Sequence, residues 1–252
     1  MKRFLITGVS SGIGRSLAKN LVLSGNEVWG IARRKESLQS LDEELKDKGK
    51  FHYLVADVSQ EKDWENLVAE MSRKKYFPQV VIFNAAIFKP DLEKGLELQL
   101  TRETFSVNFF GIIQGIEILL RFVKKGTQFL AISSLSALKG SSVEGIGYPA
   151  SKAALNIAFE SLYQKYKNTF MFKTLSFGPV STGMSHFEKK FPFLLTQNQA
   201  AKKVIEVLGG KQVINYTPWF LFFFLRILRL LPSNIYFFAL SKIESLHFKL
   251  RN

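Results

Sequence analysis

Short apolar runs alternate with stretches of helical periodicity along most of the chain. The runs suit strands that are buried on both faces of a sheet, and they occupy residues 4–6, 27–31, 51–55, 79–83, 128–132 and 170–177. After the first run, Leu17, Leu21 and Val22 recur at helical spacing. The alternation predicts an α/β fold, with a doubly wound parallel sheet between two layers of helices.

A glycine-rich loop joins the first apolar run to the first helix. Its sequence is Thr-Gly-Val-Ser-Ser-Gly-Ile-Gly, residues 7–14. Gly8 allows a sharp turn, Gly12 lets a phosphate approach the backbone, and Gly14 lets the helix pack closely on the strand. Because a helix N-terminus attracts anions, the loop predicts a Rossmann-like dinucleotide site. Its spacing differs from G-x-G-x-x-G, and a tight strand–helix turn is the alternative.

Several predicted strands are followed directly by polar residues or glycine. These residues are Asp57, Asn84, Ser133, Ser134 and Gly178. In an open parallel sheet, ligands bind outside the carboxyl ends of the strands. We therefore expect these residues to gather at one edge of the sheet, around the ligand. Taken singly, Asp57 or Asn84 is better explained as a cap or a turn former.

A tyrosine and a lysine stand four residues apart at the start of a predicted helix, in Tyr148-Pro-Ala-Ser-Lys152. Residues at this spacing share a helix face. A nearby ammonium group favours the phenolate, so the pair predicts a tyrosine whose lowered pKa suits proton exchange at neutral pH. For a bare Y-x-x-x-K pattern, an ordinary amphipathic helix is the alternative.

Several motifs in one order resemble those of the short-chain dehydrogenase/reductase family, over residues 3 to 215. The motifs are the glycine loop as TGxxxGIG, Asp57-Val58, Asn84-Ala85-Ala86, Asn108 in Val-Asn-Phe-Phe-Gly, the Tyr148 and Lys152 pair, and residues 177–182, where Phe177 replaces the family's proline. The resemblance implies a cofactor site made of Gly8, Ser10, Ser11, Gly12, Ile13, Gly14, Asp57, Val58, Asn84, Ala85, Tyr148, Lys152, Gly178, Val180 and Thr182. In this site Asp57 would contact the adenine, and Thr182 the nicotinamide carboxamide.

The same resemblance implies an oxidoreductase that interconverts a ketone or aldehyde and an alcohol by hydride transfer. Tyr148 would give its proton to the carbonyl oxygen, which the Ser134 hydroxyl would hold. Lys152 would hold the nicotinamide ribose and lower the pKa of Tyr148. Asn108 would help to organise the water chain that returns a proton to the site.

The position of the catalytic serine departs from the family pattern. The family's usual spacing would put it at Leu135, one residue beyond Ser134. We infer a one-residue insertion within residues 136–147, which leaves Ser134 at the end of its strand. Ser133 and Ser136 are the alternatives.

The end of the second predicted strand bears on the choice of cofactor. NAD enzymes place an acid there to bind the ribose hydroxyls, and this chain has Ala32 followed by Arg33 and Arg34. Two guanidinium groups suit a 2′-phosphate. The sequence therefore predicts NADP(H) in preference to NAD(H), the alternative being a solvated basic start of a helix.

The segment 216–252 is both apolar and basic. Residues 219–225 are continuously apolar, and the run is too short to span a bilayer, which takes about 20 apolar residues. The pattern on either side of Pro232 predicts two linked amphipathic helices. From Lys211 to the end there are six Lys/Arg and one acid. Two interpretations stay open: contact with an anionic membrane surface, or cover for the substrate cleft or another subunit.

Apolar residues also follow Thr182, where the family usually has its substrate lid. They are Phe187, Phe191, Phe193, Leu194 and Leu195. They favour a lipophilic carbonyl or alcohol as the substrate. The helical stretches 105–122 and 153–163 are apolar on more than one face, and in the family such helices often pair subunits. We therefore expect a homodimer or a homotetramer, the alternative being a monomer whose C-terminal helices cover these faces.

Composition adds mainly exclusions. The chain has 252 residues, 46% of them hydrophobic, which suits one domain over 1–215 with a helical extension over 216–252. It has no cysteine, and its three histidines lack ligand spacing, so we expect no disulfide and no metal. The net charge of +14 is scattered and no nucleic-acid motif accompanies it, so we expect no nucleic acid as a partner. We reject a cleaved leader and expect a cytoplasmic protein, peripheral to a membrane if 216–252 binds lipid.

Overall fold

The computed structural model describes residues 1–90, 96–141, 144–183 and 193–249, with the backbone alone for 245–249. The strands in this part of the chain are β1 (Arg3–Thr7), β2 (Glu27–Ala32), β3 (Lys50–Val55), β4 (Val80–Phe83), β5 (Gln128–Ser134), β6 (Met171–Phe177) and β7 (Ile214–Thr217). The helices are α1 (Gly12–Leu23), α2 (Lys35–Leu45), α3 (Glu61–Arg73), α4 (Leu98–Phe105), α5 (Gly111–Leu120), α6 (Gly147–Tyr166), α7 (Gln197–Gly209), α8 (Trp219–Leu228) and α9 (Ser233–Lys249). A π-helical turn, Ser106–Phe110, joins α4 to α5, and a 3₁₀ turn, Leu135–Leu138, follows β5.

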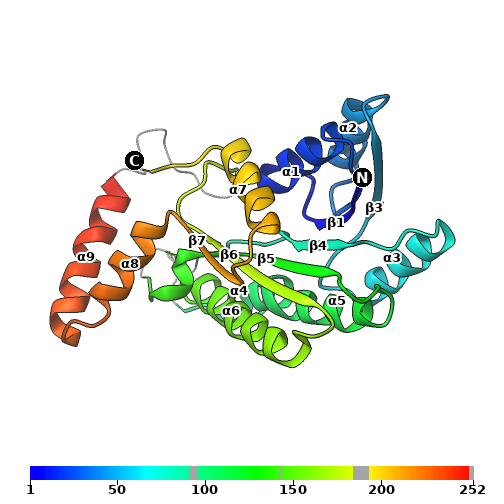
Figure 1. The fold of residues 1–252 in the computed structure, drawn as a ribbon. Coiled ribbons are helices and arrows are strands. Elements are labelled where there is room, and N and C mark those ends of the chain that lie inside the picture. Colours follow the sequence, from blue (N-terminus) through cyan, green and yellow to red (C-terminus); the bar gives the residue numbers. More distant parts are fainter. Residues whose placement is uncertain (91–95, 142–143, 184–192, 250–252) are drawn as a thin grey trace.

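The described strands form a parallel sheet in the order β3-β2-β1-β4-β5-β6-β7. Helices α1, α2 and α7 cover one face, and α3, α5 and α6 cover the other (Figure 1). Each face has its own apolar core, with Leu17 and Leu41 in one, and Trp64 and Phe159 in the other. This arrangement confirms the doubly wound α/β fold in three layers. The order reverses between β1 and β4, where such a sheet opens a crevice at its carboxyl edge.

The structure departs from the pattern-based expectations at two elements. The strand β7 was not predicted, because it has only four residues, Asn215 interrupts its apolar pattern, and it is a strand through its pairing with β6. It runs across the boundary drawn at residue 215. The helical stretch expected at 105–122 begins earlier, at Leu98, because polar residues such as Arg102 lie on its outer side and mask the periodicity.

Among the described residues, Leu98–Leu120 is long and apolar enough to cross a membrane by length and composition. Its side chains Ile112, Ile116 and Leu119 are buried in the core beneath the sheet. The α5 part of this stretch is therefore a core helix.

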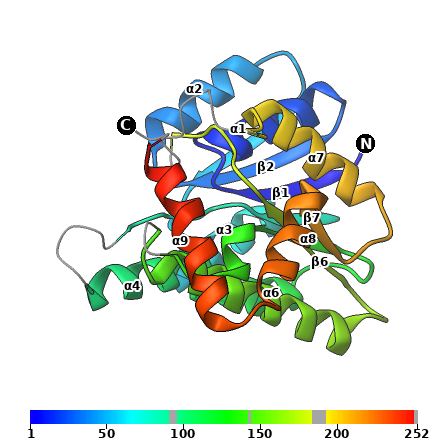
Figure 2. The same ribbon diagram turned by 90° about the vertical axis from the view of Figure 1, so that its left-hand side faces the viewer.

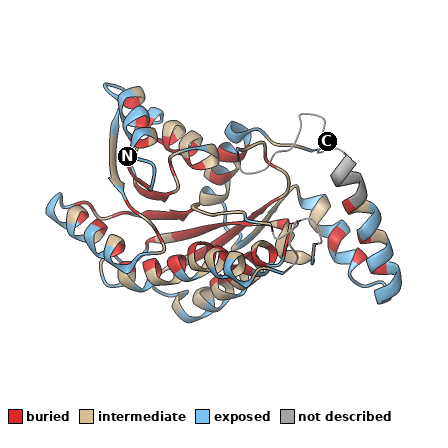
Figure 3. Cartoon of the chain, turned by 180° about the vertical axis from the view of Figure 1, so that it is seen from behind, coloured by how far each residue is buried: buried red, intermediate tan, exposed pale blue. Residues whose placement is uncertain are grey.

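The last two helices, α8 and α9, form a hairpin at the carboxyl edge of the sheet (Figure 2). We call it the C-terminal hairpin. Leu228, Tyr236 and Leu240 pack between its helices as a small separate core. An ion pair between Lys139 and Glu244, 3.4 Å long with both side chains over 90% buried, ties α9 to the loop after β5. The hairpin is thus attached to the domain at a defined place, with much of its surface exposed (Figure 3).

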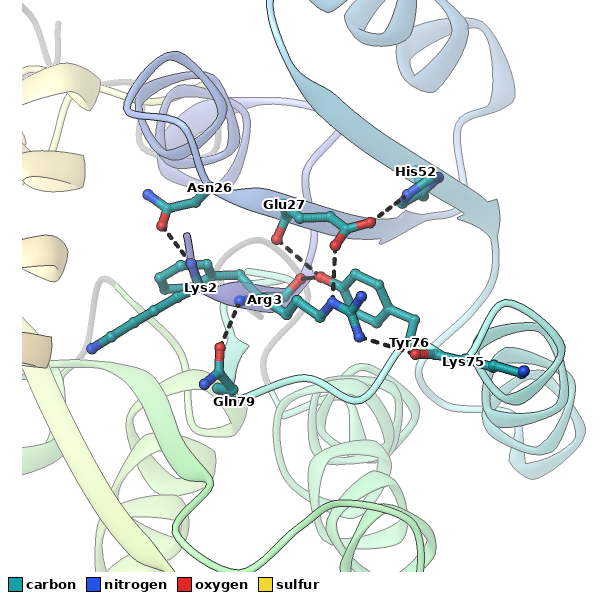
Figure 4. A network of polar contacts seen from close by, with 9 residues as sticks. Lys2, Arg3, Asn26, Glu27, His52, Lys75, Tyr76 and Gln79 are labelled. Atoms are coloured by element: carbon teal, nitrogen blue, oxygen red, sulfur yellow. Dashed lines mark hydrogen bonds and ion pairs between the residues drawn. The ribbon is translucent and has the colours of Figure 1, made fainter.

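A polar network holds the opposite edge of the sheet together (Figure 4). The Glu27 carboxylate accepts a hydrogen bond from Arg3 Nε at 2.9 Å and contacts His52 Nε2 at 3.2 Å. The Tyr76 hydroxyl donates to the carbonyl oxygen of Phe4 at 2.7 Å. Burial raises the pKa of Glu27, but the contacts with His52 and Arg3 outweigh it and leave the pKa lowered. The network joins the first three strands at the amino edge, away from the crevice.

Candidate functional site

A cavity of about 740 Å³ lies at the carboxyl edge of the sheet. The sequence-predicted residues that line it are Gly8, Ser10, Ser11, Gly12, Ile13, Arg33, Arg34, Asp57, Val58, Asn84, Ala85, Ser134, Tyr148, Lys152, Gly178, Val180 and Thr182. They come from the loops after β1 to β6 and from α6, so segments far apart in the sequence meet here. Gly14 and Asn108 lie behind the wall of the cavity.

The glycine loop forms one end of the cavity. Gly8 and Gly12 have positive φ values of 76° and 61°, a conformation that side chains disfavour. A Cβ at Gly14 would overlap the carbonyl oxygen of Gly8, so only glycine lets α1 start this close to β1. The first N–H groups of a helix lack intrahelical partners. Here they lie at the cavity, and the Ser11 side chain does not cap them.

The loops after β1 and β4 are hydrogen-bonded to each other. The Asn84 side chain donates to the carbonyl oxygens of Thr7 and Gly8, at 3.1 and 3.2 Å. The Thr7 hydroxyl accepts from the backbone N–H groups of Asn84 and Ala85, at 3.0 and 2.9 Å. Asn84 is therefore the residue that positions the glycine loop. Thr7 was not among the predicted site residues. The sequence feature that could have indicated it is a hydroxyl side chain at the end of a central strand.

Basic side chains gather where β2 ends. Arg34 Nη2 donates to the hydroxyls of Ser10 and Ser11, at 2.9 and 2.6 Å, and thereby reaches back over the glycine loop. Arg33 Nη1 lies 3.6 Å from Asp57 Oδ2. The other carboxylate oxygen of Asp57 accepts a hydrogen bond from the Ser59 N–H at 2.9 Å. Asp57 therefore also caps this turn, which was the alternative explanation for it. Both guanidinium groups line the cavity.

Tyr148 and Lys152 lie on one face of α6, one turn apart, as predicted. Both line the cavity, and Lys152 Nζ is 5.8 Å from the centre of the Tyr148 ring. The ammonium group is buried and donates to the carbonyl oxygen of Ile132 at 2.9 Å. The Tyr148 ring packs edge-on against Phe88, with 5.1 Å between ring centres. The pair thus has a fixed place in the cavity wall.

Of the three candidate serines, Ser134 is the one that influences the pKa of Tyr148, which its hydroxyl acts to lower. Its oxygen also accepts from the Ser136 N–H at 3.1 Å and lies 3.0 Å from the Ser136 hydroxyl. The Ser133 hydroxyl is buried and lacks a hydrogen-bond partner within the described residues. Position at the end of β5, rather than spacing to the tyrosine, therefore selects Ser134 as the serine beside Tyr148.

The electrostatics of Tyr148 correct one expectation. Lys152 was expected to lower the pKa of the tyrosine, whereas the structure has that pKa raised. Burial is the largest cause, the negative charge of Glu144 adds to it, and the hydrogen bond from Ser134 opposes them. Burial also lowers the pKa of Lys152, to about 8. The lysine is turned toward the Ile132 carbonyl, so burial outweighs the ammonium charge at the phenol.

Asn108 is buried in the π-helical turn between α4 and α5. Its side-chain oxygen accepts from the Ile87 N–H at 2.8 Å, and its amide donates to the Ile87 carbonyl oxygen at 2.9 Å. The amide also lies 3.2 Å from the Ser151 hydroxyl. The side chain therefore holds the backbone of the loop after β4. The predicted role in a water chain stays a prediction.

Sequence reasoning named few individual residues of the far wall of the cavity, although cover of the substrate cleft by 216–252 was one of its two open interpretations. Lys139 and Glu144 come from the loop between β5 and α6, and Leu221, Phe224, Leu225 and Ile243 come from the C-terminal hairpin. No local pattern marks them, because a fold contact alone brings them to the site. Of the residues expected in the substrate lid, Phe193 lines the cavity, whereas Phe187 and Phe191 lie outside the described residues.

Comparison with known sequences bears on this geometry. A model of the short chain dehydrogenase family matches residues 2–191. A benzil reductase ((S)-benzoin forming) of Saccharomyces cerevisiae is 32% identical over 166 residues, which are 62% of this chain and 62% of that protein. A farnesol dehydrogenase of Aedes aegypti is 29% identical over 171 residues, 65% of this chain and 70% of that protein. The chain thus aligns with about two thirds of the length of these relatives.

Solved structures match the fold over a longer part of the chain. A short chain dehydrogenase from Burkholderia cenocepacia, solved in complex with NADP, superposes with a TM-score of 0.76 and 21% identity, over 85% of this chain and 95% of that one. An alcohol dehydrogenase from Thermococcus sibiricus, complexed with 5-hydroxy-NADP, gives 0.75 and 22%, over 86% and 94%. At such identities the likeness concerns the fold. With the family match over most of the sequence, the chain belongs to the short chain dehydrogenase family.

Proposed function

We propose that the protein is an NADP(H)-dependent oxidoreductase that interconverts a lipophilic ketone or aldehyde and its alcohol. One observation carries the proposal: Ser134, Tyr148 and Lys152 converge on a cavity whose other end is the glycine loop. A proton donor and a phosphate-binding loop in one cavity suit hydride transfer coupled to proton transfer.

The residues at the cavity fit a dinucleotide. Gly8, Gly12 and Gly14 keep side chains away from the start of α1, which leaves N–H groups for a pyrophosphate. Arg33 and Arg34 stand where β2 ends, beside the expected ribose position. When bound, the reduced nicotinamide would supply the hydride.

The chain's own residues would donate the proton and stabilise the charge that develops. Because burial raises the pKa of Tyr148, its hydroxyl is protonated at neutral pH and is a donor for the carbonyl oxygen. The Ser134 hydroxyl, which lines the same cavity, would share that oxygen as negative charge develops. The charged form of Lys152 would stabilise the phenolate that forms. In the reverse direction the same groups would accept the alcohol proton.

The apolar part of the far wall supports a lipophilic substrate. Phe193, Leu221, Phe224, Leu225 and Ile243 line this part, beside the polar Lys139 and Glu144. Two relatives are named for benzil and farnesol, which are both predominantly apolar molecules. We infer that apolar side chains bind the body of the substrate while Ser134 and Tyr148 bind its oxygen.

The direct test follows NADPH oxidation at 340 nm with a panel of ketones and aldehydes of increasing chain length. We expect turnover whose kcat/KM rises with the apolar length of the substrate, by about tenfold for each two methylene groups that become buried. Tight binding of NADPH without turnover of any compound would favour a catalytically silent NADP-binding scaffold instead.

The choice of cofactor is tested at the end of β2. Arg33→Ala/Arg34→Ala is expected to raise the Kd of NADPH at least about tenfold, because two charge-assisted contacts to the 2′-phosphate are lost, and to leave the Kd of NADH within about twofold. Calorimetric titration of both cofactors measures this. Lys35→Ala removes the next cation along the chain, which does not line the cavity, and is the control. Equal increases in the Kd of NADPH and of NADH would show that the arginines do not bind the 2′-phosphate.

A further inference from the structure

The C-terminal hairpin presents two different faces. On α8, Leu221 and Leu225 line the cavity. Trp219, Phe223 and Ile227 lie on another side of the same helix and are 67%, 54% and 62% exposed. The hairpin therefore covers the cavity with one face and leaves an apolar face outside, so the two interpretations of the sequence do not exclude each other.

Both helices of the hairpin expose large apolar side chains. Those outside the cavity on α8 and the turn after it are Trp219, Phe220, Phe223, Ile227, Leu230 and Leu231, and those on α9 are Ile235, Phe237 and Phe238. We call this the exposed hairpin patch. Isolated apolar residues are common on protein surfaces, but many large aromatic and aliphatic side chains exposed on one hairpin indicate an interaction site.

Positive charges accompany the exposed hairpin patch. Arg226 lies over the Phe222 ring at 5.8 Å, and Lys242 lies over the Phe238 ring at 5.6 Å. The carboxylate of this segment, Glu244, is buried in its contact with Lys139. The outer surface of the hairpin thus combines apolar rings with cations, within a chain of net charge +14. That combination complements lipid chains below an anionic headgroup layer.

We propose that the exposed hairpin patch docks the protein on an anionic phospholipid bilayer, with α8 and α9 lying in the interface. The helices have 10 and 17 residues, fewer than the roughly 20 that a spanning helix needs. The hairpin core and the contacts of Lys139 with Glu244, and of Arg229 with the Leu138 carbonyl oxygen, hold the patch in a fixed orientation on the domain.

Sedimentation with vesicles tests the apolar part. Wild-type protein is expected to sediment with vesicles of phosphatidylcholine and phosphatidylglycerol. Phe223→Ser/Ile227→Ser is expected to lower the partition coefficient at least about tenfold, because two buried side chains are lost from the lipid. The matched control is Leu23→Ser/Leu98→Ser, whose positions are 59% and 58% exposed outside the hairpin. Unchanged melting temperatures confirm that both variants fold.

A second pair of variants tests how much the positive charges of the hairpin contribute to vesicle binding. Arg226→Gln/Lys242→Gln is expected to weaken binding to the anionic vesicles by roughly tenfold to thirtyfold, since each cation near such a surface contributes about 1 kcal/mol. Lys62→Gln/Arg121→Gln removes the same charge outside the hairpin, at the start of α3 and at the end of α5, and is expected to change binding less than about twofold.

The native tryptophans give a local readout. Trp219 is 67% exposed, whereas Trp29 and Trp64 are 2% and 1% exposed. Anionic vesicles are expected to shift the emission to shorter wavelength, and Trp219→Phe is expected to abolish the shift. Neither measurement needs cofactor or substrate, so the outcome is independent of the proposed enzymatic function. Failure of the wild-type protein to bind the vesicles of phosphatidylcholine and phosphatidylglycerol would overturn the proposal. If the serine variant then also lost subunits in sedimentation velocity, the patch would belong to a second copy.

Discussion

Tyr148→Phe is expected to lower kcat for ketone reduction by about 10²–10⁴-fold, because it removes the hydroxyl that gives a proton to the developing alkoxide. The ring and its contact with Phe88 are retained, and only the hydroxyl at the cavity is lost. The Kd of NADPH is expected to change less than about twofold, since one ring hydroxyl is removed and the glycine loop is untouched. Steady-state kinetics and calorimetry measure the two quantities separately.

Tyr163→Phe is the matched control. It makes the same change on the same helix, at a ring that packs into the core instead of lining the cavity. We expect its kcat to match that of the wild type. A Tyr148→Phe enzyme that retains kcat within about fivefold would remove Tyr148 as the proton donor. Parallel loss of NADPH binding would assign the tyrosine to binding instead.

Lys152→Met is expected to have two opposite effects: turnover falls at least about 100-fold, while the free energy of unfolding at pH 7 rises. Burial lowers the pKa of Lys152 from 10.5 to about 8, so the charged lysine destabilises the folded state by about 3 kcal/mol at pH 7. Loss of the hydrogen bond to the Ile132 carbonyl offsets about 1 kcal/mol. The net stabilisation is about 2 kcal/mol.

The effect of Lys152→Met on the free energy of unfolding depends on pH. The folded-state pKa lies below the unfolded one, so the destabilisation is complete below pH 8 and fades as the pH rises toward 10.5. Urea denaturation at pH 7 and near pH 10 is expected to show the advantage of Lys152→Met only at the lower pH. Lys165→Met, at an exposed position of the same helix, is expected to change stability by less than about 0.5 kcal/mol. A variant less stable than wild type at pH 7 would contradict the burial argument.

Wild-type kinetics are expected to report the same lysine. Below pH 8 Lys152 is charged, and above it the group loses its proton. Because kcat/KM reflects the free enzyme, this value for reduction is expected to fall as the pH rises through about 8.

Much of the fold follows from local patterns. Strands such as β4 and β5 are buried on both faces, so their apolar runs are visible in the sequence itself. The strand β7 was not predicted, because it has only four residues, it includes Asn215, which is rare in strands, and it depends on the pairing of Ile214 with Thr174. The early start of the helix at Leu98 escaped for a related reason, since its outer face is polar.

The candidate site also has a part that local sequence patterns predicted and a part that they did not. The glycine loop and the Tyr148 and Lys152 pair were visible because their chemistry depends on spacing within one turn. Glu144, Lys139 and the hairpin side chains were not, because they reach the cavity only through long-range packing. The direction of the Tyr148 pKa was predicted wrongly, since spacing says nothing of how deeply a group is buried.

The sequence by itself therefore determined the alternation of strands and helices, the phosphate loop and the tyrosine–lysine pair, because each is a periodic or contiguous pattern of side chains. Only the tertiary structure decided that Ser134 is the serine beside Tyr148, that Lys152 turns to the Ile132 carbonyl, and that α8 divides its residues between the cavity and the outer surface. The physical reason is that direction and burial are set by what packs against a residue, and the packing partners here lie far away along the chain.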